Sequence, residues 1–123
     1  MNMITWLMLA AAVLPFVAAA SSKARGQGYD HNNPRPWIAV QAGWRARANA
    51  AQANLFEGLP FFYAAVLFAL HGNADLGYLG KLMLAWVVLR LVYIAVYAGG
   101  YGTVRSLIWA VCLALNIAIL FSP

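Results

Sequence analysis

The sequence predicts an all-α integral membrane protein that forms one domain over residues 1–123, folded as an up-down bundle of four transmembrane helices. Hydrophobic residues make up 64% of the chain and charged residues only 9%. A soluble domain of this length needs far more polar surface. The apolar residues also fall into four runs, and the basic residues cluster between the first two, so we expect most of the surface to face lipid.

The formal net charge of +5 raises the alternative of a nucleic-acid binder. Such a protein would carry its basic patch on a soluble fold. Here, five of the eight basic residues lie in one stretch beside apolar runs: Lys23, Arg25, Arg35, Arg45 and Arg47. This placement is typical of a loop beside a bilayer, so the predicted partner is lipid and not nucleic acid. The single cysteine, Cys112, allows no intrachain disulfide and completes no metal-ligand pattern, so no metal site is expected.

The first helix is expected at about residues 3–20, a length of roughly 27 Å that suits the hydrocarbon core. The small residues at 18–22 resemble a signal-peptide cleavage site. No Lys or Arg precedes the run, so we interpret it as a transmembrane helix, with Pro15 as a possible kink.

The second helix is expected at about residues 37–71, after a polar stretch rich in Gly, Asn and Pro. Its first half, up to Glu57, is polar, and its second half is apolar. The third helix is expected at about 76–98, ending at a glycine pair, and the fourth at about 104–121. Short connections predict that consecutive helices are antiparallel neighbours.

Loop charge predicts the orientation of the bundle. The first and third connections carry most basic residues, so the positive-inside rule places them in the cytoplasm and both termini outside. We expect a multi-pass protein of the bacterial inner membrane. Interfacial aromatics are expected near helix ends at Trp6, Trp37, Trp44 and Trp109.

The second and third helices carry polar residues at helical spacing. Arg47, Asn54 and Glu57 are seven and three residues apart and fall near one helix face. Arg90, Tyr93 and Tyr97 are three and four apart, and we expect Arg90 to neutralise Glu57 across the bundle. We call the five residues Asn54, Glu57, Arg90, Tyr93 and Tyr97 the polar seam. An ionisable group inside a membrane helix costs about 2.5–3.5 kcal/mol near the centre, so it faces protein, water or a ligand.

Two interpretations of the polar seam remain open at this point. It forms either an interhelical clamp with no ligand or a binding site. Taken alone, Arg45 and Arg47 are better explained as cytoplasmic anchors than as ligand contacts.

The stretch from Ala51 to Phe61 resembles the second-helix signature of the MAPEG family, the membrane-associated proteins in eicosanoid and glutathione metabolism. The family pattern is Arg-Ala-(His or Gln)-x-Asn-x-x-Glu with a proline soon after, and the spacing matches from Ala51 onward. The Asn33-Pro34-Arg35 segment and the Arg90, Tyr93, Tyr97 spacing also resemble the family, so the resemblance covers nearly the whole chain.

The resemblance implies a left-handed four-helix bundle that assembles as a homotrimer, with glutathione bound between subunits toward the cytoplasmic side. It implies that the following residues contact glutathione: Asn54, Glu57 at the amino end, Tyr93, Tyr97, Arg90, and Arg25 at a carboxylate. Arg105 resembles the arginine that lowers the pKa of the thiol, because a cation near sulfur favours the thiolate. It is therefore the expected catalytic residue.

The chain departs from the family pattern at three places. Ala50 stands where the family has an arginine, and Arg47, about one turn earlier, is expected to replace it. Val92 stands where an arginine often precedes the first tyrosine, and Arg105 follows Tyr97 by eight residues instead of seven.

The first functional hypothesis is a glutathione-dependent transferase or peroxidase that acts on lipophilic electrophiles entering from the bilayer. The alternative is a non-catalytic membrane subunit or lipid-binding trimer that keeps the fold without glutathione chemistry. A transporter is a weaker third idea, because four helices are too few for the usual inverted repeats without oligomerisation.

Overall fold

The protein is a bundle of four long helices in a computed structural model that describes residues 2–123. The long helices are α1 (Asn2–Lys23), α3 (Trp44–His71), α4 (Leu76–Ala98) and α5 (Gly102–Leu120). A short helix, α2 (Pro34–Ala39), lies in the first connection. Each of the four long helices is long and apolar enough to cross a membrane, so the chain is an integral multi-pass membrane protein.

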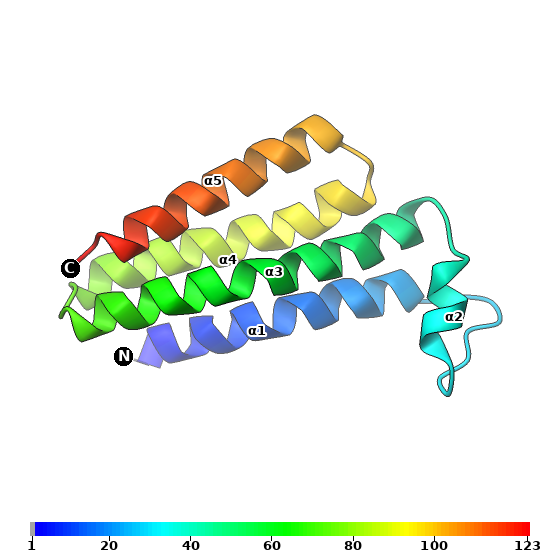
Figure 1. Cartoon of the computed structure of the whole chain (residues 1–123), viewed down its shortest axis with the longest axis horizontal. Helices are drawn as coiled ribbons and strands as arrows, with labels where there is room; N and C mark the ends of the chain where they lie inside the picture. Colours follow the sequence, from blue (N-terminus) through cyan, green and yellow to red (C-terminus); the bar gives the residue numbers. More distant parts are fainter. Residues whose placement is uncertain (1) are drawn as a thin grey trace.

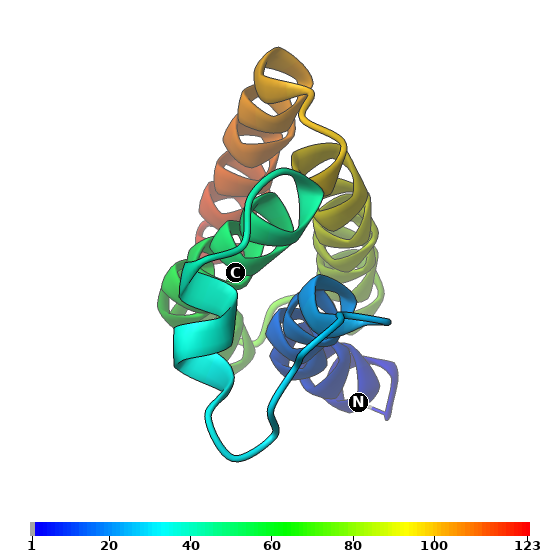
Figure 2. The ribbon, with the colours of Figure 1, turned by 90° about the vertical axis from the view of Figure 1, so that its right-hand side faces the viewer.

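Consecutive long helices run antiparallel, so both termini lie at the same end of the bundle (Figure 1). α1 packs against α3 and α4, and α5 packs against α4 and α3 from the other side. α2 and its flanking loops lie across the opposite end, outside the four-helix bundle (Figure 2). The first and third connections therefore share one end, as the sequence predicts.

Small residues allow the helices to approach closely in the core. Ala11 and Ala18 of α1 and Ala65 of α3 are fully buried. Such residues are enriched where membrane helices meet. Between α3 and α4, the rings of Phe62 and Trp86 stack with centroids 3.9 Å apart. The arrangement places α3 and α4 in close contact along the polar seam.

Two arginines fix the polar start of α3 to its neighbours. The Arg45 Nη1 donates a hydrogen bond to the carbonyl of Ser22 at 3.0 Å, near the end of α1. The Arg47 Nε donates to the carbonyl of Ala98 at 3.0 Å, at the end of α4. Carbonyls in the last turn of a helix have no partner within the helix, so these arginines cap two helices.

The second long helix begins later than the sequence predicts. The sequence predicts one helix over residues 37–71, but α3 begins at Trp44, and residues 34–39 form the separate helix α2. The chain breaks at Gly43, whose φ of 64° and ψ of −141° are open to glycine and strained for other residues. The third helix matches the expected range, 76–98, while α5 begins two residues earlier than expected, at Gly102.

Candidate functional site

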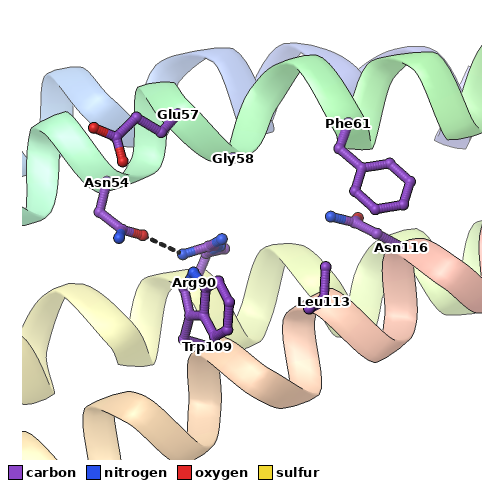
Figure 3. Close-up of a pocket in the computed structure, with 8 residues that line it drawn as sticks. All are labelled: Asn54, Glu57, Gly58, Phe61, Arg90, Trp109, Leu113 and Asn116. Atoms are coloured by element: carbon purple, nitrogen blue, oxygen red, sulfur yellow. Dashed lines mark hydrogen bonds between the residues drawn. The ribbon is translucent and has the colours of Figure 1, made fainter.

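Three residues of the polar seam, Asn54, Glu57 and Arg90, line a crevice between α3, α4 and α5, which we call the central crevice (Figure 3). It encloses about 240 Å³. The α3 helix contributes Asn54, Glu57, Gly58 and Phe61 to its wall, α4 contributes Arg90, and α5 contributes Trp109, Leu113 and Asn116. The crevice therefore combines one cation, one carboxylate and two amides with apolar walls.

Arg90 is the most buried charged group of this crevice, with 3% of its surface exposed. Its Nη1 donates a hydrogen bond to the Asn54 Oδ1 at 3.1 Å, while its Nε has no partner within residues 2–123. The guanidinium also lies 5.3 Å from the ring centroid of Trp86 and 5.1 Å from that of Tyr93. Rings in these positions stabilise a cation without neutralising it.

The expected ion pair between Arg90 and Glu57 is not formed within the described chain. Arg90 pairs with the neutral amide of Asn54, whereas the Glu57 side chain is exposed at the mouth of the same crevice. Gly58 permits the arrangement, because a Cβ at this position would lie 2.8 Å from the Arg90 Nη2. The crevice therefore holds one carboxylate and one guanidinium whose charges are not paired with each other.

Asn116 is a member of the site that the sequence reasoning missed. Its side chain is 3% exposed, and its Oδ1 has no hydrogen-bond partner within residues 2–123. Figure 3 shows its amide directed into the crevice beside Phe61. Buried polar atoms are nearly always paired, so this amide is a candidate contact for a ligand or a bound water. A lone amide in an otherwise apolar run is the sequence signal that marks it.

A second, smaller hollow lies at the end of the bundle that carries the first and third connections. This end pocket encloses about 80 Å³, and its wall includes Arg47, Tyr97 and Arg105. The Arg105 guanidinium lies 4.6 Å from the centroid of the Tyr97 ring. Arg47 thus has a structural role at Ala98 and also presents a cation to this pocket.

A row of two tyrosine rings with an arginine at each end connects the two hollows. Arg90 lies over Tyr93, Tyr93 meets Tyr97 edge-to-face with centroids 5.6 Å apart, and Arg105 lies over Tyr97. Three of these residues come from successive turns of α4 and the fourth from the start of α5. The structure therefore brings the predicted residues Arg90, Tyr93, Tyr97 and Arg105 into one continuous row.

Arg25 is not brought to these residues within one chain. It lies after α1 and lines a separate hollow with Lys23. The other predicted residues line either the central crevice or the end pocket, or, like Tyr93, connect them.

The guanidinium and amide groups that line the central crevice and the end pocket are suited to an organic anion. Within residues 2–123 no group of three or more His, Cys, Asp or Glu side chains is arranged to hold a metal ion. Guanidinium and amide groups bind carboxylates through charge-assisted hydrogen bonds. The Glu57 carboxylate adds a contact for an amine.

Four membrane-spanning helices with a hollow between α3, α4 and α5 that is lined by a cation, a carboxylate and two amides define a class of integral membrane protein with polar groups inside its bundle. Comparison with protein families identifies the class more closely: the model of the MAPEG family matches residues 3–123, so the chain belongs to the MAPEG family. The comparisons with curated proteins and with solved structures returned no significant match.

Proposed function

We propose that the protein is a glutathione-dependent transferase or peroxidase that acts on lipophilic electrophiles dissolved in the bilayer. The observation that carries the proposal is the central crevice, where Arg90 and Glu57 are present together and Arg90 pairs with Asn54 instead of with Glu57. A zwitterionic peptide ligand needs both a cation for a carboxylate and a carboxylate for an amine. A clamp that only held the helices together would be expected to pair the two charges.

The proposed roles follow the position of each side chain. Glu57, exposed at the mouth of the crevice, accepts from the amine of the tripeptide, and Arg90 donates its free Nε to a carboxylate. Asn54 holds Arg90 in place and offers its remaining amide donors to the ligand. Arg47 supplies the second cation at the end pocket, in place of the family arginine that is Ala50 here.

Arg105 is the proposed catalytic residue. Glutathione supplies the thiol, and its thiolate form is the nucleophile. Attack on an electrophilic carbon forms a C–S bond while a leaving group departs with the electron pair of its bond to that carbon. Attack on a peroxide oxygen forms a sulfenic acid while the O–O bond breaks and the departing alkoxide takes up a proton. Arg105 stabilises the thiolate because its guanidinium lines the end pocket beside the Tyr97 ring, and a cation close to sulfur favours the charged form of the thiol.

The size of the crevice supports a site shared between copies. Its volume in one chain is about 240 Å³, whereas ligand sites commonly span about 300–1,000 Å³. A homotrimer, as in the relatives that the sequence resembles, would cover the open side where Glu57 is exposed. The proposed assembly is therefore a trimer with the ligand enclosed between neighbouring chains.

Calorimetry on the purified protein tests the proposal. Wild-type protein is expected to bind glutathione, and Glu57→Gln and Arg90→Met are each expected to weaken binding about 10- to 100-fold, because each removes a charge-assisted hydrogen bond. Tyr78→Phe is the matched control, since Tyr78 is an exposed tyrosine at the other end of α4. No heat with wild-type protein at millimolar glutathione would rule out the proposal.

Thiolate absorbance in the ultraviolet tests the role of Arg105 separately. Adding glutathione to wild-type protein is expected to give a thiolate signal near neutral pH, and Arg105→Ala is expected to lose that signal while still binding the tripeptide. A variant that keeps the full thiolate signal would remove Arg105 from the mechanism.

The second candidate function is a non-catalytic or lipid-binding member of the family. The observation that favours it is Ala50, a half-buried position with no side-chain donor where the family has an arginine. The same calorimetry separates the two candidates, because only the enzyme requires glutathione to bind.

A further inference from the structure

A third hollow lies in the connection between α1 and α2, and we call it the connection hollow. It is an open hollow of about 500 Å³ at the surface, and it shares no lining residue with the central crevice. Lys23, Arg25, Tyr29 and His31 form its polar side, and alanines of the last turn of α1 and just beyond it form its apolar side. The hollow thus joins basic groups to the alanine side chains at the end of a membrane-spanning helix.

Aromatic contacts hold the polar wall of the connection hollow in place. The Tyr29 ring packs edge-on against His31 and Trp37, with centroids 4.8 and 5.1 Å apart. The Trp37 Nε1 donates a hydrogen bond to the carbonyl of Gln27 at 2.9 Å, and the Lys23 Nζ lies 5.9 Å from the Tyr29 centroid. The wall is therefore a packed structure and not a loose loop.

Arg25 adopts a backbone conformation that is uncommon for its residue type. Its φ is +54°, in the left-handed region that favours glycine or asparagine. The turn after α1 holds it there, with the Gly26 N–H donating to the Lys23 carbonyl at 3.1 Å. The turn fixes the point from which the Arg25 side chain leaves the backbone beside Lys23.

The cations of the connection hollow outnumber the nearby acids. Asp30 is the only acidic residue between positions 21 and 43. Its Oδ1 accepts a hydrogen bond from the backbone N–H of Asn32 at 2.9 Å, which ties the carboxylate to its own turn. Lys23 and Arg25 therefore present net positive charge to a ligand.

The position of the hollow along the membrane normal identifies the ligand chemistry. Lys23 is the last residue of the membrane-spanning helix α1, so the hollow lies where the hydrocarbon core gives way to lipid headgroups. An acyl chain beside α1 would run along the alanine side while its headgroup met the cations. A soluble anion would use only the cationic half of this surface.

We propose that the connection hollow binds the phosphate-bearing headgroup of an anionic phospholipid from the leaflet at the α2 end of the bundle. Lys23 and Arg25 contact the phosphodiester, and Tyr29 holds Lys23 in position through its ring face. This site is independent of the central crevice and of the proposed glutathione chemistry.

Native mass spectrometry of the detergent-solubilised protein tests the proposal with phosphatidylglycerol and phosphatidylcholine as probes. Wild-type protein is expected to bind the anionic lipid at least tenfold more tightly than the zwitterionic one. Lys23→Gln with Arg25→Asn is expected to reduce phosphatidylglycerol affinity about tenfold or more, since each cation near a membrane surface contributes roughly a fivefold change. Asparagine is chosen at position 25 because it tolerates the left-handed conformation.

Lys81→Gln is the matched control, because Lys81 is an exposed lysine at the opposite end of the bundle, and it is expected to leave lipid binding unchanged. Equal affinity for the two lipids, or equal effects of the double variant and the control, would overturn the proposal. Displacement of the lipid by equimolar glycerol phosphate would also overturn it, because the site would then recognise a free phosphate. If the double variant lost glutathione binding but kept lipid binding, Arg25 would belong to the glutathione site instead, and the lipid proposal would be wrong.

Discussion

The Arg90 side chain is held in position by one hydrogen bond, to Asn54, and by contacts with the rings of Trp86 and Tyr93. Its charge is buried among α3, α4 and α5, where only the Asn54 amide oxygen accepts a hydrogen bond from it within residues 2–123. Hydrogen bonds between membrane helices average below 1 kcal/mol, while those to charged groups reach about 1.5–3 kcal/mol in soluble proteins. The contribution of the Arg90–Asn54 hydrogen bond to the unfolding free energy is therefore large enough to measure.

A double-mutant cycle measures the coupling between Asn54 and Arg90. The cycle compares the unfolding free energies of the wild type, Asn54→Leu, Arg90→Met and the double variant. We expect a coupling free energy of about 1–2 kcal/mol between the two side chains, because either single change leaves the partner with one hydrogen bond fewer. Reversible unfolding in mixed micelles supplies the four free energies. A coupling indistinguishable from zero would mean that the contact does not stabilise the bundle.

Gly58→Ala separates stability from ligand binding. An added Cβ would meet the Arg90 Nη2 at 2.8 Å, which is closer than van der Waals contact, so the guanidinium that bonds Asn54 must shift from its position. The moving atom is the end of a flexible side chain, and alanine favours the helix, so the unfolding free energy is expected to change by no more than about 1 kcal/mol. Glutathione affinity is expected to fall about tenfold by calorimetry.

Gly77→Ala provides the control for Gly58→Ala. Gly77 lies near the start of α4, and a Cβ there makes only ordinary contact, 3.5 Å from the Asp75 Oδ2. This variant is expected to bind glutathione like the wild type. Equal affinity in both alanine variants would show that the position of Arg90 does not matter for binding.

Sequence spacing predicts the polar seam but not all of its neighbours. Asn54 and Glu57 recur at helical spacing on α3, and Arg90, Tyr93 and Tyr97 do so on α4, so the residues of each helix share a face because of the helical period. The α5 residues that line the crevice beside Asn116 are apolar, and the polar residues of the crevice come from α3 and α4. Its role therefore depends on how α5 is rotated against α3, which the period of a single helix does not determine.

Among the elements, α4 is the one whose limits the sequence predicts best. Asp75 accepts a hydrogen bond from the Tyr78 N–H at 2.9 Å, as an N-cap does, and Gly99 ends the helix. The break between α2 and α3 was not predicted, since residues 37–43 carry no proline and a single glycine is compatible with a helix. What marks the break is the backbone conformation of Gly43, a property of the folded chain.

Gly43→Ala tests whether α2 and α3 are separate helices. At φ +64° and ψ −141° an alanine is strained, so the unfolding free energy is expected to fall by about 1–3 kcal/mol. If residues 37–71 formed one continuous helix, Gly43→Ala would instead raise the unfolding free energy by about 0.5–1 kcal/mol, because alanine is more stable than glycine inside a helix. Thermal unfolding in detergent distinguishes the two signs. Gly102→Ala is the control, because a Cβ at that position meets no atom within 4 Å and little change is expected.

At the scale of the whole molecule, the surface of one chain is not uniformly suited to lipid. The outer face of α4 presents apolar side chains such as Leu84 and Val88, whereas α3 exposes Glu57 within a helix that crosses the membrane. A charge facing lipid costs up to about 2.5–3.5 kcal/mol, depending on its depth. The α3 face is therefore the one expected to be covered by another copy of the chain, and the α4 face is expected to remain in contact with lipid.

Cysteine cross-linking tests this division of the surface. Ala53→Cys places a thiol one turn from Glu57 on the exposed side of α3, and Val88→Cys places one on the apolar face of α4. The native Cys112 is buried and is expected to stay unreactive toward a short bis-maleimide in the folded protein. The α3 variant is expected to form cross-linked oligomers in membranes, and the α4 variant is expected to remain monomeric on denaturing gels.

Light scattering of the solubilised wild type is expected to give about 40 kDa, as three chains of 13.4 kDa require. Equal cross-linking from both positions, or a mass of one chain, would contradict a shared site at the α3 face, because Glu57 would then have to meet lipid or water without the cover of a second copy.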